Sequence, residues 1–173
     1  MIRSKTHYKI LLSTDTVEKM AKEIERKYLV QGNDWRKLSQ GSVYRQGYIA
    51  TQDGVTVRVR IAGEKGFLTI KGPSVKYSRS EFEYPIPIED AQEMLDTLCQ
   101  RPFIEKIRYR VEWGNLIWEI DEFDGVNKGL ILAEVELNDE AQEIELPPWI
   151  GREVSDDPRY FNSNLVKRPF SQW

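Results

Sequence analysis

Hydrophobic and charged residues alternate along most of the chain between residues 23 and 137. Between residues 55 and 61, for example, valine and isoleucine occupy the odd positions, whereas Thr56, Arg58 and Arg60 occupy the even ones. Alternate side chains of a β-strand point to opposite faces, so this period of two predicts strands rather than helices. The segments that show it are 23–30, 43–50, 55–62, 66–71, 79–86, 104–113, 115–123 and 130–137.

Short turn signals separate several of these segments. Asp53-Gly54 and Gly114-Asn115 each lie between two alternating stretches, as in tight hairpins. Glycines at both ends of 63–66 and 125–129 mark two further short returns. Strands joined by hairpins pair with their neighbours in the antiparallel direction, so we expect an antiparallel sheet.

One helix is predicted over residues 87–99, which begin with Pro87 and carry Ala91, Met94, Leu95 and Leu98 on one stripe. Further helices are expected over 139–145 and 157–167, and Asp15 with Glu18 resembles a capped helix start. We expect residues 1–19 to be an N-terminal extension and residues 20–173 to form one domain.

The charged faces of the predicted strands have two interpretations. A strand with one apolar and one charged face is ordinarily half-buried, with its charged side in water. Eight strands in hairpin order can also close into a barrel whose interior alternates with its exterior. Charges turned inward are costly to bury, unless a water-filled tunnel binds an anion and metal ions. The fold class expected on this second interpretation is α+β, mostly β: an eight-stranded antiparallel closed barrel with a charged interior and helices packed outside.

Composition narrows the classes of function. The 173 residues are 40% hydrophobic and 31% charged, and the net charge is only −3, which disfavours a general nucleic-acid or membrane-surface binder. Cys99 is the only cysteine and His7 the only histidine, so an intrachain disulfide, a Cys- or His-based metal site and a histidine triad are excluded. The longest apolar run near the start, Ile10 to Leu12, is too short for a signal peptide, and we expect a cytoplasmic protein.

The segment EIERKYLV, at residues 23–30, resembles the ExExK signature of the CYTH superfamily, the triphosphate tunnel metalloenzymes. Further blocks resemble those of the family in the same order along residues 22–165: YRQGYI, VRVR, LTIK, SRSEFEYPI, EKIRYR, WEIDEF, LAEVEL and GREVSDDPRYFNSNL. The resemblance implies an eight-stranded tunnel that binds a triphosphate with a divalent metal. Within the superfamily, the chain is most similar to the bacterial inorganic triphosphatase branch.

The resemblance also implies a set of phosphate-binding residues. Arginine suits bidentate contacts with phosphate oxygens, and lysine supplies a point charge. The residues matched to the basic tunnel positions are Lys27, Arg58, Arg60, Lys71, Arg79, Lys106 and Arg108. Arg45 and Arg159 are weaker candidates, and for Arg159 a surface role is at least as good an interpretation.

Metal ligands are implied in the same way. Hard divalent cations take oxygen ligands, and Mg²⁺ or Mn²⁺ is expected. Glu23, Glu25, Glu134 and Glu136 match the metal carboxylates of the family, with Glu81, Glu83 and Asp121 as further ligands or water-positioning groups. The first and last strands become neighbours when a barrel closes, which would gather the first four.

For catalysis, Lys71 and Lys106 match a lysine pair associated with water activation in the triphosphatase branch. Crowded cations depress a lysine pKa, so Lys106 could act as a general base, with metal-activated water as the alternative.

We expect hydrolysis of inorganic triphosphate to pyrophosphate and phosphate. The expected partner is this small-molecule substrate, and the expected oligomeric state is a monomer or a homodimer. Class IV adenylate cyclase, thiamine triphosphatase and RNA triphosphatase remain open, because all use the same phosphate and metal groups. A non-catalytic polyphosphate- or nucleotide-binding module, or a barrel that binds a protein partner, is also open.

Overall fold

The computed structural model describes residues 24–52, 54–73, 80–139 and 141–173. Nine strands form one antiparallel sheet in the order β5-β4-β3-β2-β6-β7-β8-β1-β9. The strands are β1 (Ile24–Val30), β2 (Ser42–Ile49), β3 (Thr56–Ala62), β4 (Lys65–Lys71), β5 (Glu81–Ile86), β6 (Ile104–Trp113), β7 (Leu116–Phe123), β8 (Ile131–Leu137) and β9 (Ile150–Glu153). The predicted mostly-β antiparallel architecture is therefore confirmed, and the short β9 adds a strand that the alternation did not predict.

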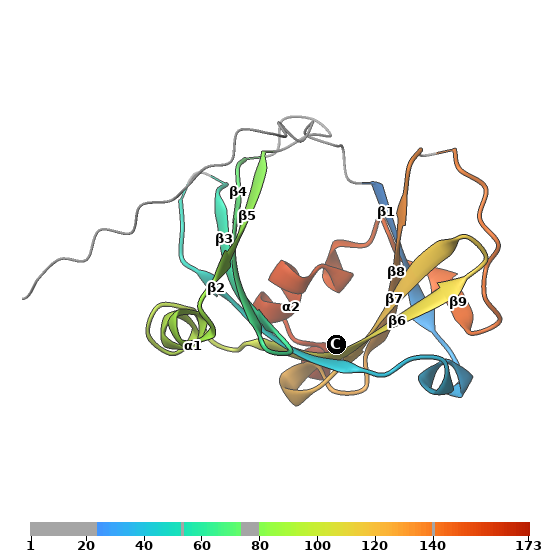
Figure 1. The fold of residues 1–173 in the computed structure, drawn as a ribbon, viewed down its shortest axis with the longest axis horizontal. Coiled ribbons are helices and arrows are strands. Elements are labelled where there is room, and N and C mark those ends of the chain that lie inside the picture. The colour runs from blue at the N-terminus through green and yellow to red at the C-terminus, as the bar shows by residue number, and fades with distance from the viewer. Residues whose placement is uncertain (1–23, 53, 74–79, 140) are drawn as a thin grey trace, which may run out of the picture.

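The sheet bends into a deep trough, with β5, β4 and β3 forming one wall and β7, β8 and β1 the other (Figure 1). The predicted neighbourhood of the first and last barrel strands is confirmed, because β1 pairs with β8 along its length, from Ile24↔Leu137 to Leu29↔Leu132. Strands β5 and β9 are the two edges of the sheet, and they do not pair with each other within the described part of the chain. The described strands thus have the curvature of a tunnel, and hydrogen bonds among them do not close the barrel.

The two α-helices lie on opposite faces of this sheet. Helix α1 (Ile88–Thr97) packs on the convex face against β3 and β4, as expected for a helix outside the barrel. Helix α2 (Asn162–Lys167) lies inside the trough, so the prediction that the helices pack outside is wrong for α2 (Figure 1). The reason is that Leu165 of α2 packs against apolar residues of the concave face, including Ile104 and Leu132.

The other predicted helices also differ from the structure. Residues 139 and 141–145 are not helical, because the Asp139 and Gln142 side chains accept hydrogen bonds from nearby backbone N–H groups and favour a turn. The helix expected over 157–167 is divided into a 3₁₀ turn, Pro158–Tyr160, and α2, with Phe161 extended between them. The suspected helix start at Asp15 and the proposed extension, residues 1–19, lie outside the described residues.

Three hydrophobic clusters hold the sheet. Two lie on its convex face, one around Trp118 and Trp149 and the other around Val59 and Leu95 under α1. The third lies on the concave face at one end of the trough, where the C-terminal segment packs against β6, β7 and β8. The inner face of the sheet is therefore apolar at one end, and its charged residues gather along the rest. None of the helices in the described ranges is long and apolar enough to cross a membrane.

Candidate active site

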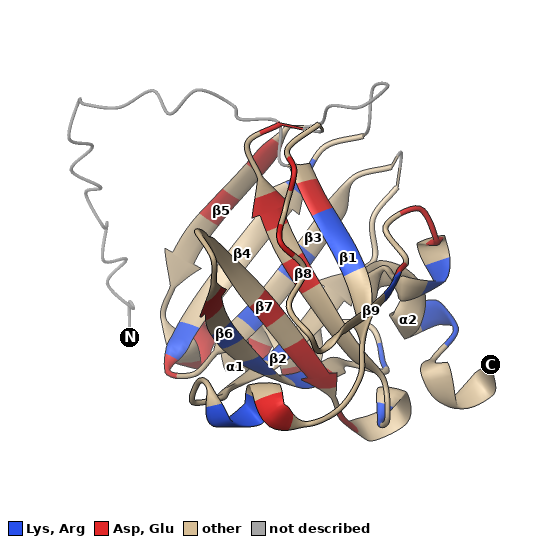
Figure 2. Ribbon diagram, turned by 90° about the vertical axis from the view of Figure 1, so that its right-hand side faces the viewer, with Lys and Arg blue, Asp and Glu red and all other residues tan. Residues whose placement is uncertain are grey.

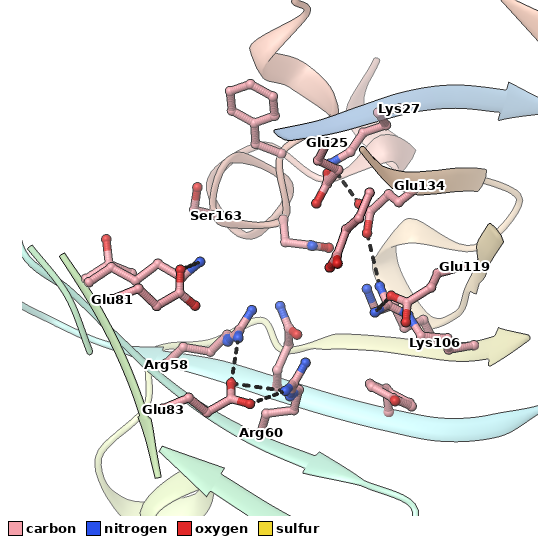
Figure 3. A pocket seen from close by; sticks show the side chains of 18 of the residues that line it. Glu25, Lys27, Arg58, Arg60, Glu81, Glu83, Lys106, Glu119, Glu134 and Ser163 are labelled. Atoms are coloured by element: carbon pink, nitrogen blue, oxygen red, sulfur yellow. Dashed lines mark hydrogen bonds and ion pairs between the residues drawn. The ribbon is translucent and has the colours of Figure 1, made fainter. Parts of the chain in front are cut away.

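A cavity of about 760 Å³ opens on the concave face of the sheet. Positions of Lys, Arg, Asp and Glu recur along the strands that enclose it (Figure 2), and a close view shows charged side chains pointing from both walls toward a shared space (Figure 3). The predicted site residues that line it are Glu25, Lys27, Arg58, Arg60, Lys71, Glu81, Glu83, Lys106, Arg108, Glu134 and Glu136. The interpretation of the charged strand faces as an interior is supported over that of a wet outer surface.

Three of the described candidates, Asp121, Arg45 and Arg159, do not line the cavity, and two further candidates cannot be placed. Glu23 and Arg79 lie outside the described residues. Asp121 lies on the cavity side of β7 but is fully buried beneath the lining. Arg45 lies on the opposite face of β2, stacked on Phe103 and near Glu105, while Arg159 pairs with Asp157 at the surface.

On one wall, two arginines share a single carboxylate. Glu83 of β5 accepts hydrogen bonds from Arg60 Nη2 at 3.0 Å, Arg58 Nη2 at 3.2 Å and Thr69 Oγ1 at 2.8 Å. Burial opposes ionisation of Glu83, but the Thr69 hydroxyl and the two guanidinium groups outweigh it, and the pKa of Glu83 is lowered. Burial and the nearby charge of Arg58 lower the pKa of Arg60, so its positive charge is incompletely compensated.

The opposite wall carries carboxylates on β1 and β8. Lys27 Nζ lies 2.8 Å from Glu134 Oε1 and 3.2 Å from Glu25 Oε1. Burial disfavours the charged Lys27, but the two carboxylates outweigh it and raise its pKa. Burial likewise opposes ionisation of Glu134, yet Lys27, Lys106 and Arg108 lower its pKa to about 2. On this wall, the neighbouring cations therefore favour the ionised form of Glu134.

A buried ionic group lies under the floor of the cavity. The Asp121 carboxylate accepts hydrogen bonds from Lys106 Nζ and from Arg108 Nε at 2.7 Å and Nη2 at 2.6 Å. Arg108 also reaches Glu134 Oε2 at 3.1 Å, which links the floor to the β8 wall. Desolvation lowers the pKa of Lys106; Asp121 opposes this shift and Arg108 adds to it. The predicted direction is confirmed, with burial rather than crowding by cations as the chief cause.

The prediction of site residues missed Arg110, Glu119 and the uncharged part of the lining. Tyr44, Gln46 and Tyr48 lie on the cavity face of β2, and the Tyr44 ring lies between Arg60 and Arg108, 5.8 and 5.3 Å from their guanidinium carbons. The alternation of β2 places these three on one face. The inner faces of the other strands were recognised by their charged side chains, and these three residues carry no charge. The cavity is also lined by Ser155, Phe161, Asn162 and Ser163, from a segment without strand alternation.

The carboxylates of β1 and β8 suit a divalent cation in their chemistry. Glu25 and Glu136 are direct partners in the β1–β8 ladder, and Glu134 is two residues from Glu136 on the same face. Carboxylate oxygens are the ligands that Mg²⁺ and Mn²⁺ prefer. In the described part of the chain, no group of three acidic, histidine or cysteine side chains is arranged to hold a metal ion. Glu25 and Glu134 contact Lys27 instead. The donor set therefore fits such a metal in kind, and small side-chain movements would be needed to gather it.

The family model of the CYTH domain matches residues 21–169 of this chain. The chain belongs to the CYTH family. A protein of Acetivibrio thermocellus named inorganic triphosphatase is 51% identical over 154 residues, covering 89% of this chain and 99% of that protein. A protein of Nitrosomonas europaea with the same name is 38% identical over 149 residues, covering 83% and 96% of the two chains.

The fold is also similar to that of solved CYTH-type structures. A crystal structure of an inorganic triphosphatase superposes with a TM-score of 0.61 at 36% identity, covering 83% of this chain and 97% of the other. Family membership implies a divalent metal ion, and the paired carboxylates of β1 and β8 are where the described residues would hold it.

Proposed function

We propose that this protein is an inorganic triphosphatase, which hydrolyses inorganic triphosphate to pyrophosphate and phosphate with Mg²⁺ or Mn²⁺. One observation carries the proposal: a cationic wall and a carboxylate-bearing wall face each other across one cavity of about 760 Å³. A polyanion and a divalent cation are the ligands that such a pair of walls would hold together. The names of the two relatives, which are 51% and 38% identical to this chain, support the same substrate.

The cationic side of the cavity would bind the phosphate chain. Arg58 and Arg60 line the cavity, and their guanidinium groups carry the donors that suit phosphate oxygens. Lys71 lies on the same wall and Lys27 on the opposite one, and Arg108 lies between them on β6. Arg79 remains a predicted contact outside the described residues. Together these groups would neutralise the triphosphate and hold its scissile bond in one orientation, which is most of what phosphoryl transfer requires.

Glu25, Glu134 and Glu136 would hold the metal, with Glu23 as a further predicted ligand. The bound ion would supply charge neutralisation at the phosphate oxygens and would favour deprotonation of a water. For this chain, the carboxylates on β1 and β8 therefore fix the side of the cavity on which the reacting phosphate lies.

The Lys106 amine would accept the proton of the attacking water. The water oxygen would bond to a terminal phosphorus, the bond from that phosphorus to the bridging oxygen would break, and pyrophosphate would leave with the electron pair. Desolvation favours the neutral amine of Lys106, which is the form that can take a proton. Lys71 would serve as a phosphate contact.

The test is a panel of inorganic triphosphate, ATP and thiamine triphosphate, each with Mg²⁺, with Mn²⁺ or with EDTA, followed by identification of the products. Inorganic triphosphate should be cleaved fastest, to pyrophosphate and phosphate, and EDTA should abolish the reaction. Formation of cyclic AMP from ATP at a comparable rate would contradict the proposal in favour of a cyclase. Binding of every triphosphate without turnover would favour a non-catalytic module.

A further inference from the structure

Strand β5 is an edge of the sheet and carries two carboxylates that face the cavity cations. Among the described strands it pairs with β4 alone, where Glu81 is the direct partner of Lys71 and Glu83 is the direct partner of Thr69. Glu81 Oε2 lies 2.6 Å from Lys71 Nζ, and Glu83 binds Arg58 and Arg60. The cations of this wall are thus neutralised by carboxylates from a single edge strand.

Glu83 occupies the place between the two arginines that an anion would take. Its Oε2 atom accepts from Arg58, Arg60 and Thr69, and its Oε1 atom accepts from Arg60. A phosphate oxygen would use the same donors. Because these donors cannot serve Glu83 and a phosphate fully at the same time, the two anions compete for them.

We propose that Glu83 is an internal competitor of phosphate, displaced from Arg58 and Arg60 when substrate binds, and that it weakens the retention of the pyrophosphate product. The inference rests on the proposed function, and it assigns Glu83 a role other than metal binding. It makes Glu83 a residue that sets how many phosphate contacts a ligand must form in order to stay bound.

Exposure of the groups indicates which of them moves. The Glu83 side chain is 35% exposed, whereas the side chains of Arg58 and Arg60 are 16% and 17% exposed. The carboxylate can therefore turn into water with little change in its surroundings, while the arginines stay in the wall. Figure 3 shows Glu83 on the wall opposite Lys27 and Glu134, away from the carboxylates assigned to the metal.

Competition by Glu83 affects the affinities of long and short phosphate ligands unequally. A phosphate that takes the Nη2 donors of Arg58 and Arg60 must displace Glu83, so its apparent affinity is scaled down by the fraction of protein in which Glu83 has left. Triphosphate offsets this loss through contacts with Lys27 on the opposite wall and with Arg108 between the walls. Pyrophosphate has one phosphate fewer with which to span the cavity, so the same loss brings it closer to release.

The test compares wild type with Glu83→Gln, which keeps the shape of the side chain and removes its charge. Calorimetry measures the Kd of pyrophosphate in EDTA at constant ionic strength, and steady-state assays with Mg²⁺ measure the inhibition constant of pyrophosphate. The substitution removes the charge of Glu83, and with it the charge-assisted hydrogen bonding that competes with phosphate for the two arginines at a partly exposed site. Glu83→Gln should therefore bind pyrophosphate about tenfold more tightly in both measurements. Measurable binding by Glu83→Gln where wild type shows none has the same meaning.

Glu122→Gln is the matched control. The Glu122 side chain is 33% exposed and pairs with Arg36 at 2.6 Å, but it does not line the cavity. Its pyrophosphate affinity should equal that of wild type. Should Glu83→Gln fail to fold, Glu83→Asp, which withdraws the charge by one methylene, should tighten binding in the same direction.

Unchanged or weaker pyrophosphate binding by the Glu83 variant overturns the proposal, as does a selective loss of Mn²⁺ binding, which would make Glu83 a metal ligand. Pyrophosphate binding in EDTA needs no turnover. A wild-type protein that cleaves no triphosphate would therefore contradict the proposed function while leaving the Glu83 comparison decisive by itself.

Discussion

Lys106 and Asp121 form an ion pair that is almost completely removed from solvent, with side-chain exposures of 2% and 0%. They lie on adjacent strands, β6 and β7, and Arg108 binds the same carboxylate from the next position on its face of β6. The proposed general base, Lys106, is therefore held by a buried counter-charge rather than by contact with bulk water. Substitutions of Lys106 and of Asp121 can test its proton affinity and its position.

Replacement of Lys106 by alanine should lower kcat with a smaller effect on KM, because the amine acts mainly in the transition state. Desolvation lowers the pKa of Lys106 below its ordinary 10.5, so the neutral base forms, and the wild-type rate rises, at lower pH than an exposed lysine would allow. Lys106→Ala should remove this alkaline-going rise in the pH–rate profile, whereas Lys128→Ala, at an exposed lysine, should retain it. A wild-type profile with only KM changed would make Lys106 a phosphate ligand.

Asp121→Asn should unfold more easily than wild type. The substitution leaves Lys106 and Arg108 buried without their shared counter-charge, and breaking a buried ion pair typically costs about 3–5 kcal/mol. Because Asp121 raises the pKa of Lys106, its loss should also move the rise in rate to lower pH. Urea unfolding and the pH–rate profile measure the two effects, and normal stability with altered Mn²⁺ affinity would instead support the predicted role of Asp121 as a metal ligand.

Glu25→Gln and Glu136→Gln should each abolish activity while the protein remains folded. The two residues are direct partners across the β1–β8 ladder, so each substitution removes one hard anionic oxygen donor from the same place. Calorimetric titration with Mn²⁺ should show weaker binding in both variants, and Glu122→Gln, on the other side of β7, provides the comparison. If metal affinity and metal dependence of the rate are unchanged in both, these residues do not belong to the metal site.

Stability in acid should depend on Glu134. Its pKa of about 2 in the folded protein lies below the ordinary 4.5, so the folded state favours the ionised carboxylate. That stabilisation is fully present above pH 4.5 and is lost as the pH falls toward 2. The difference of 4.5 − 2 pKa units sets an upper limit of about 3 kcal/mol. Urea unfolding at pH 6 and pH 3 should show a smaller acid-induced loss in Glu134→Gln than in wild type; equal losses would contradict the assignment.

The sequence by itself determined which side chains share a face. A strand has a period of two, so Arg58 with Arg60, Lys106 with Arg108, and Glu134 with Glu136 must point the same way wherever the strands lie. The family resemblance, carried by motifs in order along nearly the whole chain, likewise needed no coordinates. Helix α1 was predictable because its apolar stripe and Pro87 are local signals.

Only the tertiary structure decided which face is the interior. An alternating strand looks the same whether its charged side meets water or another charged wall, and the curvature of the sheet and the pairing of β1 with β8 resolve this. The placement of α2 inside the trough depends on Leu165 meeting Ile104 and Leu132, which are distant in sequence. Depth is also a tertiary property: Glu119 and Asp121 share a face of β7, yet one lines the cavity and the other lies buried beneath it. The contact of Glu83 with Arg58 and Arg60 joins β5 to β3 across β4, and no local pattern encodes it, because ion pairs across a sheet depend on register, twist and side-chain reach together.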